Sequence, residues 1–351
     1  MVGHAGRSRS GGRPTLEEVA ARAGVGRGTV SRVINGSPRV SDSTRAAVEA
    51  AVAELGYVPN TAARALAANR SDAIALVVPE PETRFFVEPY FSDMLKGVGA
   101  ALTDTEMQLL LIFAGNDHER RRLAQYLAAH RVDGVLLVSV HADDPLPDLL
   151  SQLEIPTVIS GPRSAHETLP SVDSDNYGGG RSAVEHLMAR GRRRIGTITG
   201  RLDVYGAKRR VEGYREALAD AGRPVDEQLI VPGDFTEEGG RRAMAVLLER
   251  CPELDAVFAE SDVMAAGARQ VLREAGRRIP DDVALVGYDD SAIARHMDPP
   301  LTTVRQPIEE MGRAMIDLLL DEIGDRRPAV SRGLDRSQVV LPTELVQRFS
   351  S

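Results

Sequence analysis

The stretch Val25-Gly-Arg-Gly-Thr-Val-Ser-Arg-Val-Ile-Asn35 predicts a short helix, and a second short helix precedes it from Thr15. Thr15 and Glu18 have the spacing of a capping box, in which each side chain bonds to the backbone N–H of the other residue. Gly24 predicts the end of the preceding helix, because glycine adopts the left-handed conformation found there without a steric penalty. Two short helices joined by a tight glycine turn form the pattern of a helix-turn-helix.

The second of these helices carries apolar residues for a core and polar residues for a surface. The inward set is Val25, Val30, Val33 and Ile34, and the outward set is Arg27, Thr29, Ser31, Arg32 and Asn35. Arginine can donate two hydrogen bonds to the edge of a guanine, whereas Ser, Thr and Asn suit phosphate oxygens. Taken alone, this pattern also fits a small helical bundle with solvated arginines.

The next thirty residues favour DNA recognition over a plain bundle. Ser41 is a suitable N-cap for a third helix, with Val48, Val52 and Leu55 as its inward stripe. Four sequence motifs of this region are informative: Thr-Val-Ser-Arg-Val-Ile-Asn-Gly (29–36), Val-Ser-Asp-Ser-Thr-Arg (40–45), Leu-Gly-Tyr-Val-Pro-Asn (55–60) and Ala-Arg-Ala-Leu (63–66). With these four motifs in this order, the sequence resembles the lac repressor/gal repressor (LacI-type) family of bacterial transcription regulators. The resemblance covers all but roughly the first thirteen residues.

The resemblance implies which residues contact DNA. Arg27, Gly28 and Arg32 occupy the family's base-reading positions, and Gly28 has no side chain with which to read. The whole expected set is Thr15, Arg27, Gly28, Thr29, Ser31, Arg32, Asn35, Ser41, Tyr57, Asn60, Ala63, Arg64 and Leu66. Gly26 replaces the family's usual Ser at the helix start, which predicts a weaker N-cap. Residues 62–68 are too short for a stable isolated helix, so we expect them to order on DNA, with Leu66 wedged between base pairs in the minor groove.

Composition and charge fit a DNA-binding protein with a separate body. The 351 residues predict two or three domains. Residues 1–70 hold ten Arg and five Asp or Glu, which gives this part a net charge of +5. Because the whole chain has a net charge of −8, residues 71–351 carry −13. The single cysteine, Cys251, excludes an internal disulfide and is expected to be a structural thiol. No apolar run approaches the ~18 residues of a membrane span, and residues 1–14 lack the apolar core of a signal peptide. We therefore expect a cytoplasmic protein.

From Asp72 onward, short apolar runs alternate with helical stretches, which predicts parallel α/β sheets. The expected strands are 74–78, 108–113, 134–138 and 157–160, then 195–199, 229–231, 256–259 and 283–286. The fold class is an all-α helix-turn-helix head plus a core of two parallel-sheet subdomains, which resembles the periplasmic sugar-binding fold. The predicted domains are a disordered basic arm (1–13), the head (14–59), a hinge helix and linker (60–71), and an effector-binding and dimerisation domain (72–351).

Within that last domain the chain is expected to cross between subdomains three times, near Asp173, near 302–306 and near Arg336. Subdomain 1 is predicted to hold about 72–172 and 306–335, and subdomain 2 about 173–305 and 336–351. The stretch Val339–Val346 is interpreted as one strand of subdomain 2. No leucine-heptad tail follows, so a homodimer rather than a tetramer is predicted.

Motifs for catalysis and for cofactors do not emerge from the sequence. Gly178-Gly-Gly180 lacks the spacing of a dinucleotide fingerprint and is better interpreted as the start of a helix. The histidines form no His-x-x-x-His pair, and there is no Cys-x-x-Cys, so no metal site is predicted. We expect no enzyme and no cofactor, although a sugar-acting enzyme on the same α/β fold remains an alternative.

The resemblance also indicates an effector site, and a sugar ligand would suit its chemistry. Polar side chains can pair with hydroxyl groups, and aromatic side chains can cover the faces of sugar rings. The expected residues are Tyr90, Phe91, Arg210, Phe235, Ser261, Asp289, Gln306 and Ile308. Each has a structural alternative: the aromatics could be core residues, Arg210 could be solvated beside Arg209, and Asp289 or Asp290 could cap a helix. Ser261-Asp262 stands where the family often has Asn-Asp.

The segment Glu80–Glu88 is longer than the usual family loop at the cleft mouth, and it adds Phe85 and Phe86. Extra aromatic surface there suits a disaccharide such as cellobiose. We therefore interpret the chain as a DNA-binding transcription regulator, a repressor that binds a palindromic double-stranded operator. Its operator affinity would be controlled by a small carbohydrate in the cleft. A purine-type corepressor is the alternative within the same class.

Overall fold

The computed structural model describes residues 14–34, 37, 39–58, 71–324 and 338–351. The chain divides into two compact units, residues 1–71 and 72–351. Five of the expected DNA contacts, Asn35, Asn60, Ala63, Arg64 and Leu66, lie outside the described residues, as does the predicted hinge helix. In the part of the chain that is described, no helix is long and apolar enough to cross a membrane.

The first unit is built from three helices, α1 (Leu16–Ala23), α2 (Arg27–Ile34) and α3 (Asp42–Leu55). The predicted capping box is confirmed: Thr15 Oγ1 accepts from the Glu18 N–H at 3.3 Å, and the Thr15 N–H donates to Glu18 Oε2 at 2.8 Å. Gly24 ends α1 at φ 68°, and Ser41 caps α3. The core consists of buried residues from all three helices, namely Val19, Ala20, Val30, Val33, Val48 and Ala51.

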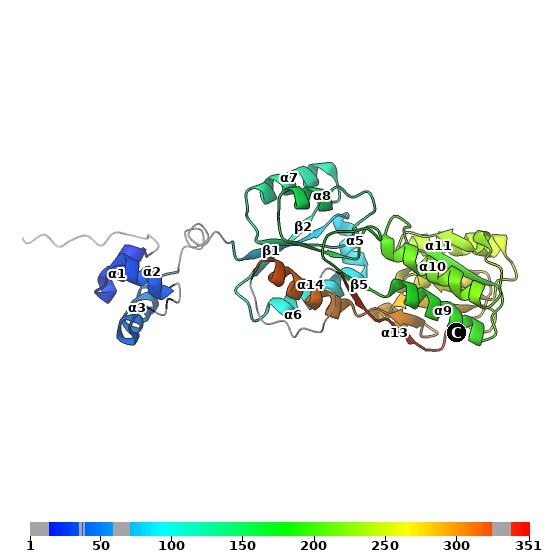
Figure 1. Ribbon diagram of the computed structural model, residues 1–351. Coiled ribbons are helices and arrows are strands. Elements are labelled where there is room, and N and C mark those ends of the chain that lie inside the picture. Colours follow the sequence, from blue (N-terminus) through cyan, green and yellow to red (C-terminus); the bar gives the residue numbers. More distant parts are fainter. Residues whose placement is uncertain (1–13, 35–36, 38, 59–70, 325–337) are drawn as a thin grey trace, which may run out of the picture. The chain divides into compact units, whose positions relative to one another are not determined.

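The second unit contains two six-stranded sheets (Figure 1). The first sheet has the order β11-β5-β4-β3-β1-β2, and the second has the order β12-β10-β9-β8-β6-β7. All neighbouring strands are parallel except β12, which is antiparallel to β10. The bounds are β1 Ala73–Val78, β2 Gln108–Phe113, β3 Gly134–Leu137, β4 Thr157–Ser160, β5 Ser171–Ser174, β6 Ile195–Thr199, β7 Ile230–Pro232, β8 Ala256–Ala259, β9 Ala284–Asp289, β10 Thr302–Arg305, β11 Gln338–Leu341 and β12 Glu344–Val346.

Helices cover both faces of each sheet, as the alternation of apolar runs and helical stretches predicted. The helices are α5 Glu82–Val87, α6 Pro89–Leu102, α7 Asp117–Ala128, α8 Leu146–Gln152, α9 Asn176–Ala189, α10 Tyr205–Asp220, η1 Glu227–Leu229, α11 Glu237–Arg250, α12 Asp262–Glu274, α13 Ala292–His296 and α14 Ile308–Glu322. On the first sheet, α6 and α14 pack on one face and α7 and α8 on the other. On the second, α11 and α12 cover one face and α9 and α10 the other.

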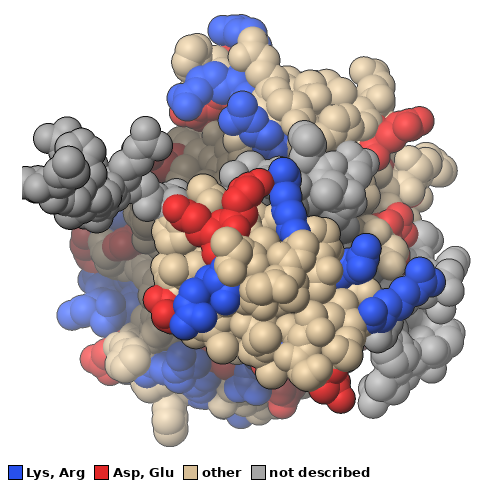
Figure 2. Space-filling model, turned by 90° about the vertical axis from the view of Figure 1, so that its left-hand side faces the viewer, with Lys and Arg blue, Asp and Glu red and all other residues tan. Residues whose placement is uncertain are grey.

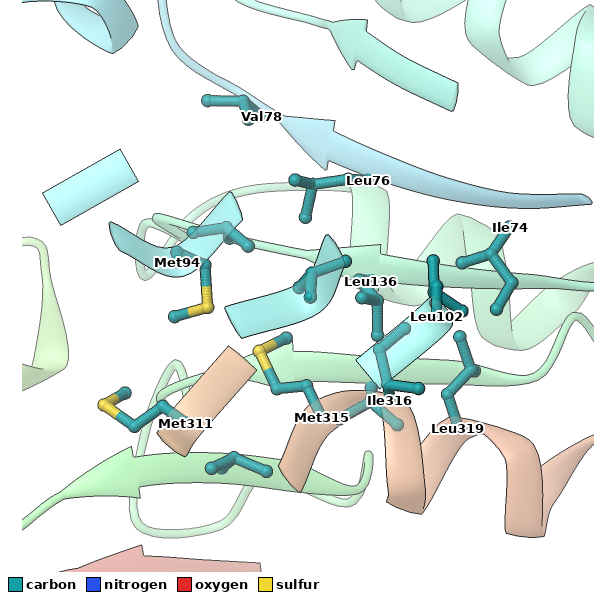
Figure 3. Close-up of a cluster of buried hydrophobic side chains, with 14 of the residues drawn as sticks. Ile74, Leu76, Val78, Met94, Leu102, Leu136, Met311, Met315, Ile316 and Leu319 are labelled. Atoms are coloured by element: carbon teal, nitrogen blue, oxygen red, sulfur yellow. The ribbon is translucent and has the colours of Figure 1, made fainter. Parts of the chain in front are cut away.

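A large apolar cluster lies between the first sheet and helices α6 and α14 (Figure 3). Ile74 and Leu76 of β1 point toward Met315, Ile316 and Leu319 of α14, and all five are at most 1 % exposed. The chain returns to the first subdomain for α14, so this core joins segments far apart in the sequence. Packing of this kind fixes the carboxyl ends of the strands, where ligands bind in parallel α/β sheets.

Three connections join the two sheets, and the last differs from the prediction. β11 pairs with β5 in the first sheet and β12 pairs with β10 in the second, so Val339–Val346 is not one strand of subdomain 2. Pro342 and Thr343 separate the two strands, and a proline cannot donate to a sheet ladder. The strand β5 was not predicted, because its sequence Ser-Val-Asp-Ser has no apolar run. The predicted helix start near Gly178 is confirmed, since Asp175 Oδ1 accepts from the Gly178 N–H at 2.8 Å.

Candidate functional site

The second helix of the three-helix unit presents its polar residues to solvent. Val30 and Val33 are buried, whereas Arg27, Gly28 and Arg32 are exposed. Arg27 Nη1 lies 3.0 Å from Glu17 Oε1, and both side chains are more than 60 % exposed. Exposed pairs of this kind contribute little to stability, so Arg27 can exchange this partner for a base or a phosphate.

Charge on the described surface of this unit is mixed rather than uniformly basic. Its described residues contain five arginines and five carboxylates, so the predicted surplus of +5 comes from Arg7, Arg9, Arg13, Arg64 and Arg70, which lie outside them. Arg22 is paired with Glu54 at 2.5 Å. Figure 2 shows basic and acidic side chains interspersed on the face that it presents. The basic residues that flank the helices therefore supply the net attraction to phosphate.

In the second unit, a cavity lies between the two sheets, at the carboxyl ends of strands from both. It encloses about 830 Å³, including its open mouth. Seven of the eight expected effector residues line it: Tyr90, Phe91, Arg210, Phe235, Ser261, Asp289 and Gln306. The structure thus brings together residues that are up to 216 positions apart in the sequence.

Arg210 is a buried residue of the cavity wall and not a solvated surface arginine. It is 7 % exposed, its Nε donates to Asn176 Oδ1 at 2.8 Å, and its Nη1 donates to the Glu260 carbonyl at 2.6 Å. The guanidinium carbon lies 3.7 Å from the centre of the Tyr288 ring. These contacts fix the orientation of the guanidinium and leave further N–H groups for a ligand, because arginine has five.

Asp289 and Gln306 form a polar bridge beside the connections between the subdomains. Gln306 Nε2 donates to Asp289 Oδ1 at 2.6 Å, and Ser174 Oγ donates to Gln306 Oε1 at 2.6 Å. Neither Asp289 nor Asp290 caps α13, because Ser291 occupies that position. Asp289 has φ 112°, an unfavourable conformation for a residue with a side chain. The surrounding bonds hold it where its carboxylate lines the cavity.

The three expected aromatic residues serve different purposes. Tyr90 lies with its hydroxyl 2.6 Å from Ser160 Oγ. Phe91 is 2 % exposed and packs against Phe85, with ring centres 5.3 Å apart, so it is mainly a core residue that also forms part of the wall. Phe235 belongs to the second subdomain, and the guanidinium carbon of Arg84 from the first lies 5.5 Å from its ring centre.

Three carboxyl groups of the cavity wall have pKa values well above those of exposed carboxyl groups, because they are buried. Burial raises the pKa of Glu88 to about 7, that of Asp173 to about 6 and that of Asp289 to about 7. The charged form of a carboxylate is disfavoured where water is excluded. A ligand that donates hydrogen bonds to these oxygens would therefore replace the missing water.

Several wall residues were not predicted, among them Arg84, Glu88, Asp173 and Asn176. Asp173 lies in the unpredicted strand β5 and Asn176 begins the helix after it, and a cluster of polar residues at a strand end could have indicated them. Ser261 lines the cavity, but its Oγ caps α12 by accepting from the Met264 N–H at 3.1 Å.

Two expectations about the cavity were wrong. Ile308 does not line it; the side chain is 4 % exposed and packs in the core beside α6 and α14. Phe85 and Phe86 do not line it either: the segment 82–87 is the helix α5, which buries Phe85 and leaves Phe86 76 % exposed. Helical spacing instead turns Arg84 and Glu88, four residues apart, toward the cavity.

Comparison with known proteins places this chain in a family. Residues 15–60 match the model of bacterial regulatory proteins of the lacI family, and residues 184–351 match a periplasmic binding protein-like domain. The chain is 51 % identical to the HTH-type transcriptional regulator CelR of Thermobifida fusca, over 96 % of this chain and 98 % of that protein.

Solved structures agree with this assignment. A transcriptional regulator CelR–cellobiose complex is 49 % identical with a TM-score of 0.75, covering 97 % of this chain and all of that one. A lac repressor dimer bound to operator and the anti-inducer ONPF is 27 % identical with a TM-score of 0.83, covering 97 % of this chain and 99 % of that one. The chain therefore belongs to the lacI family of bacterial regulatory proteins and is a DNA-binding transcription regulator, not an enzyme.

Proposed function

We propose that this regulator is a homodimeric repressor of a palindromic operator, and that an uncharged carbohydrate, a disaccharide such as cellobiose, controls its operator affinity from the cavity. The observation that carries this proposal is the convergence of Arg210, Asp289 and Gln306 with Tyr90 and Phe235 on one cavity. Side chains that pair with hydroxyl groups and rings that cover apolar faces are what a sugar requires. The structure of the related CelR in complex with cellobiose supports the proposal that the ligand is a disaccharide.

The charges around the cavity favour an uncharged ligand. Three carboxylates, Glu88, Asp173 and Asp289, line it together with two arginines, Arg84 and Arg210. Arg84 is already bonded to Glu80 and Glu88, so its charge is largely neutralised. Sugar hydroxyls can donate to carboxylate oxygens and accept from carboxyl groups, so an uncharged sugar suits these acids in either protonation state.

The exposed edge of the first sheet supports a dimer. The edge strand β2 has the sequence Gln-Leu-Leu-Leu-Ile-Phe and no buried residue, and Leu111 is 37 % exposed. Phe86 and Val87, which are 76 % and 64 % exposed, adjoin it, since the rings of Phe86 and Phe113 have centres 6.4 Å apart. Long apolar edge strands are prone to aggregation unless they are covered. A second copy of the chain would cover this patch, as the dimer of the related lac repressor suggests.

Effector control requires that a ligand bind two states of the protein with different affinity. Tyr90 belongs to the first subdomain, and Arg210 and Asp289 belong to the second. A sugar held by both sets would favour a closed cleft. Closure would change the spacing of the two amino-terminal units in a dimer, and with it the fit to two operator half-sites.

A thermal-shift screen of monosaccharides, disaccharides, uronic acids and purines tests the ligand class. Neutral disaccharides are expected to raise the melting temperature, and acidic sugars are not. If only purines raise the melting temperature, the effector is a purine-type corepressor and not a sugar. Sedimentation of wild type and Leu111→Glu tests the dimer, since a charge at the centre of the patch should yield monomers. A wild type that sediments as a monomer would refute that part of the proposal.

A further inference from the structure

Beside the cavity lies a second hollow, which is also walled by both subdomains. It encloses about 710 Å³, including its open mouth, and it shares Pro162, Asp173, Asn176 and Tyr205 with the wall of the cavity. Resting on the proposed function, we propose that this hollow is a second sugar subsite, so that the effector site takes a linear, uncharged oligosaccharide longer than a disaccharide. Two sugar units lie in the cavity, and the further units lie in the hollow.

The four shared residues connect the two spaces with polar groups. Pro162 and Asp173 belong to the first subdomain, whereas Asn176 and Tyr205 begin helices α9 and α10 of the second. Asn176 Nδ2 donates to Asp173 Oδ1 at 2.9 Å, and Asn176 Oδ1 accepts from Arg210 Nε at 2.8 Å. This chain of hydrogen bonds runs from the cavity wall to the wall of the hollow. One sugar chain can therefore contact the same residues on both sides of the boundary.

The hollow contains the two kinds of group that a sugar ring requires. Tyr177 supplies an aromatic ring, and Val340, which is 60 % exposed, supplies an apolar side chain that a ligand would cover. Ser164, Arg209 and Gln338 supply groups that can pair with hydroxyls. These residues line the hollow and not the cavity, so a disaccharide held in the cavity does not need them.

The charged side chains of the hollow are already bonded within the protein. Asp175 Oδ1 accepts from the Gly178 N–H at 2.8 Å, as the cap of α9. Arg209 pairs with Glu212, and its guanidinium carbon lies 4.8 Å from the centre of the Tyr177 ring. These contacts hold the charged groups in place and leave donors and acceptors for hydroxyl groups. An uncharged ligand suits this wall, as it suits that of the cavity.

The position of the hollow in the fold agrees with a ligand-binding role. Gln338 and Val340 belong to β11, which is one edge strand of the first sheet, and β2 is the opposite edge strand. The apolar patch that we assign to the dimer lies at β2. A second copy seated on that patch does not occupy the hollow.

The test is calorimetric titration of the full-length protein with cellobiose and with cellotetraose. Wild type is expected to bind cellotetraose about tenfold more tightly, the gain from one or two net hydrogen bonds to the additional sugar units. Tyr177→Ala should lose most of this gain and bind cellobiose like wild type, because Tyr177 lines only the hollow.

The matched control is Tyr126→Ala. Tyr126 is a half-buried tyrosine of α7 with the guanidinium carbon of Arg131 5.4 Å from its ring centre, so it resembles Tyr177 in its surroundings but lines neither space. It should keep the wild-type preference for cellotetraose. An equal preference in Tyr177→Ala and Tyr126→Ala would overturn the inference.

A second measurement locates the longer sugar. Ala165 is exposed and lines the hollow, whereas the native Cys251 is buried, so alkylation of an Ala165→Cys variant reports on the hollow. Cellotetraose should slow this alkylation more than cellobiose does. Cellobiose is the reference because it closes the cleft without reaching the hollow. Equal protection by the two sugars would contradict the second subsite.

The two sugars also separate this inference from the proposed function. If cellobiose binds wild type while cellotetraose gains neither affinity nor added protection at position 165, the hollow is a water-filled crevice and the proposed function stands. If neither sugar binds wild type, the proposed ligand fails and the second subsite fails with it.

Discussion

Replacement of Arg210 by lysine should weaken effector binding while the protein still folds and binds its operator. Lysine keeps the charge but has one nitrogen where arginine has a fork of five N–H groups. Two of these hold Asn176 Oδ1 and the Glu260 carbonyl, at 2.8 and 2.6 Å. A lysine at this position can serve those acceptors or the ligand, but not all of them. Loss of one charge-assisted hydrogen bond to the ligand costs about 1.5–3 kcal/mol, which is about a tenfold to hundredfold loss of effector affinity.

Alanine at position 210 is a less informative substitution than lysine. It would leave two buried acceptors unpaired and would remove the cation beside Asp173, Asp289 and Glu260. Removing one partner of a buried charged cluster costs about 3–5 kcal/mol of stability, so Arg210→Ala tests folding as much as ligand binding.

The assay is operator binding by fluorescence anisotropy with and without the disaccharide found in the screen, together with thermal unfolding. Arg210→Lys should bind the operator like wild type and require more effector to change that binding. Arg209→Lys is the matched control, because Arg209 is more exposed and pairs with Glu212. If Arg210→Lys responds at the same effector concentration as Arg209→Lys, Arg210 does not contact the effector and the site is misplaced.

Four further predictions concern base reading, the three-helix unit and two residues that contact the cavity wall. Arg32→Ala should cost about 1–3 kcal/mol at its guanine and relax specificity there; an unchanged ratio of operator to scrambled-DNA binding would contradict it. Gly28→Ala should stabilise the isolated unit by about 0.5–1 kcal/mol in thermal unfolding, since a Cβ there meets nothing within 4 Å. Gly200→Ala should weaken effector binding in calorimetry, because its Cβ would lie 1.9 Å from the Phe235 ring; unchanged affinity would show that the ring is not used. Burial raises the pKa of Glu260 to about 8, so its folded form holds a proton that the unfolded chain releases at lower pH; the melting temperature should fall as pH rises from about 6 to 8, and less steeply in Glu260→Gln.

Much of the fold could be predicted because its signals are local. The capping box of Thr15 and Glu18 depends on residues three positions apart, and the left-handed glycine at 24 depends on one residue. Apolar runs such as 108–113 and 256–259 identified strands by composition alone. The strand β5 escaped this reasoning because its sequence is short and polar. Its place in the sheet is set by pairing with β4 and β11, which the local sequence does not encode.

The candidate effector site was predicted unevenly for the same reason. Family motifs indicated Arg210, Asp289 and Gln306, but not what each side chain contacts. Ile308 was placed in the cavity because it follows Gln306 by two residues. The structure instead begins α14 at Ile308 and packs its side chain in the core. The extra segment 80–88 was recognised as unusual, yet its helical conformation reversed which side chains face the cavity.

The sequence by itself determined the family, the three-helix unit and the alternation of strands and helices, because caps, turns and apolar periodicity act over a few residues. Only the tertiary structure decided which side chains share the cavity wall. Residues as distant as Arg84 and Phe235, or His141 and Asp203, meet only when two separately packed sheets face each other. The burial that shifts the acids of the wall arises from the same packing. The chemistry of this site is therefore a property of the packed subdomains rather than of any one stretch of the chain.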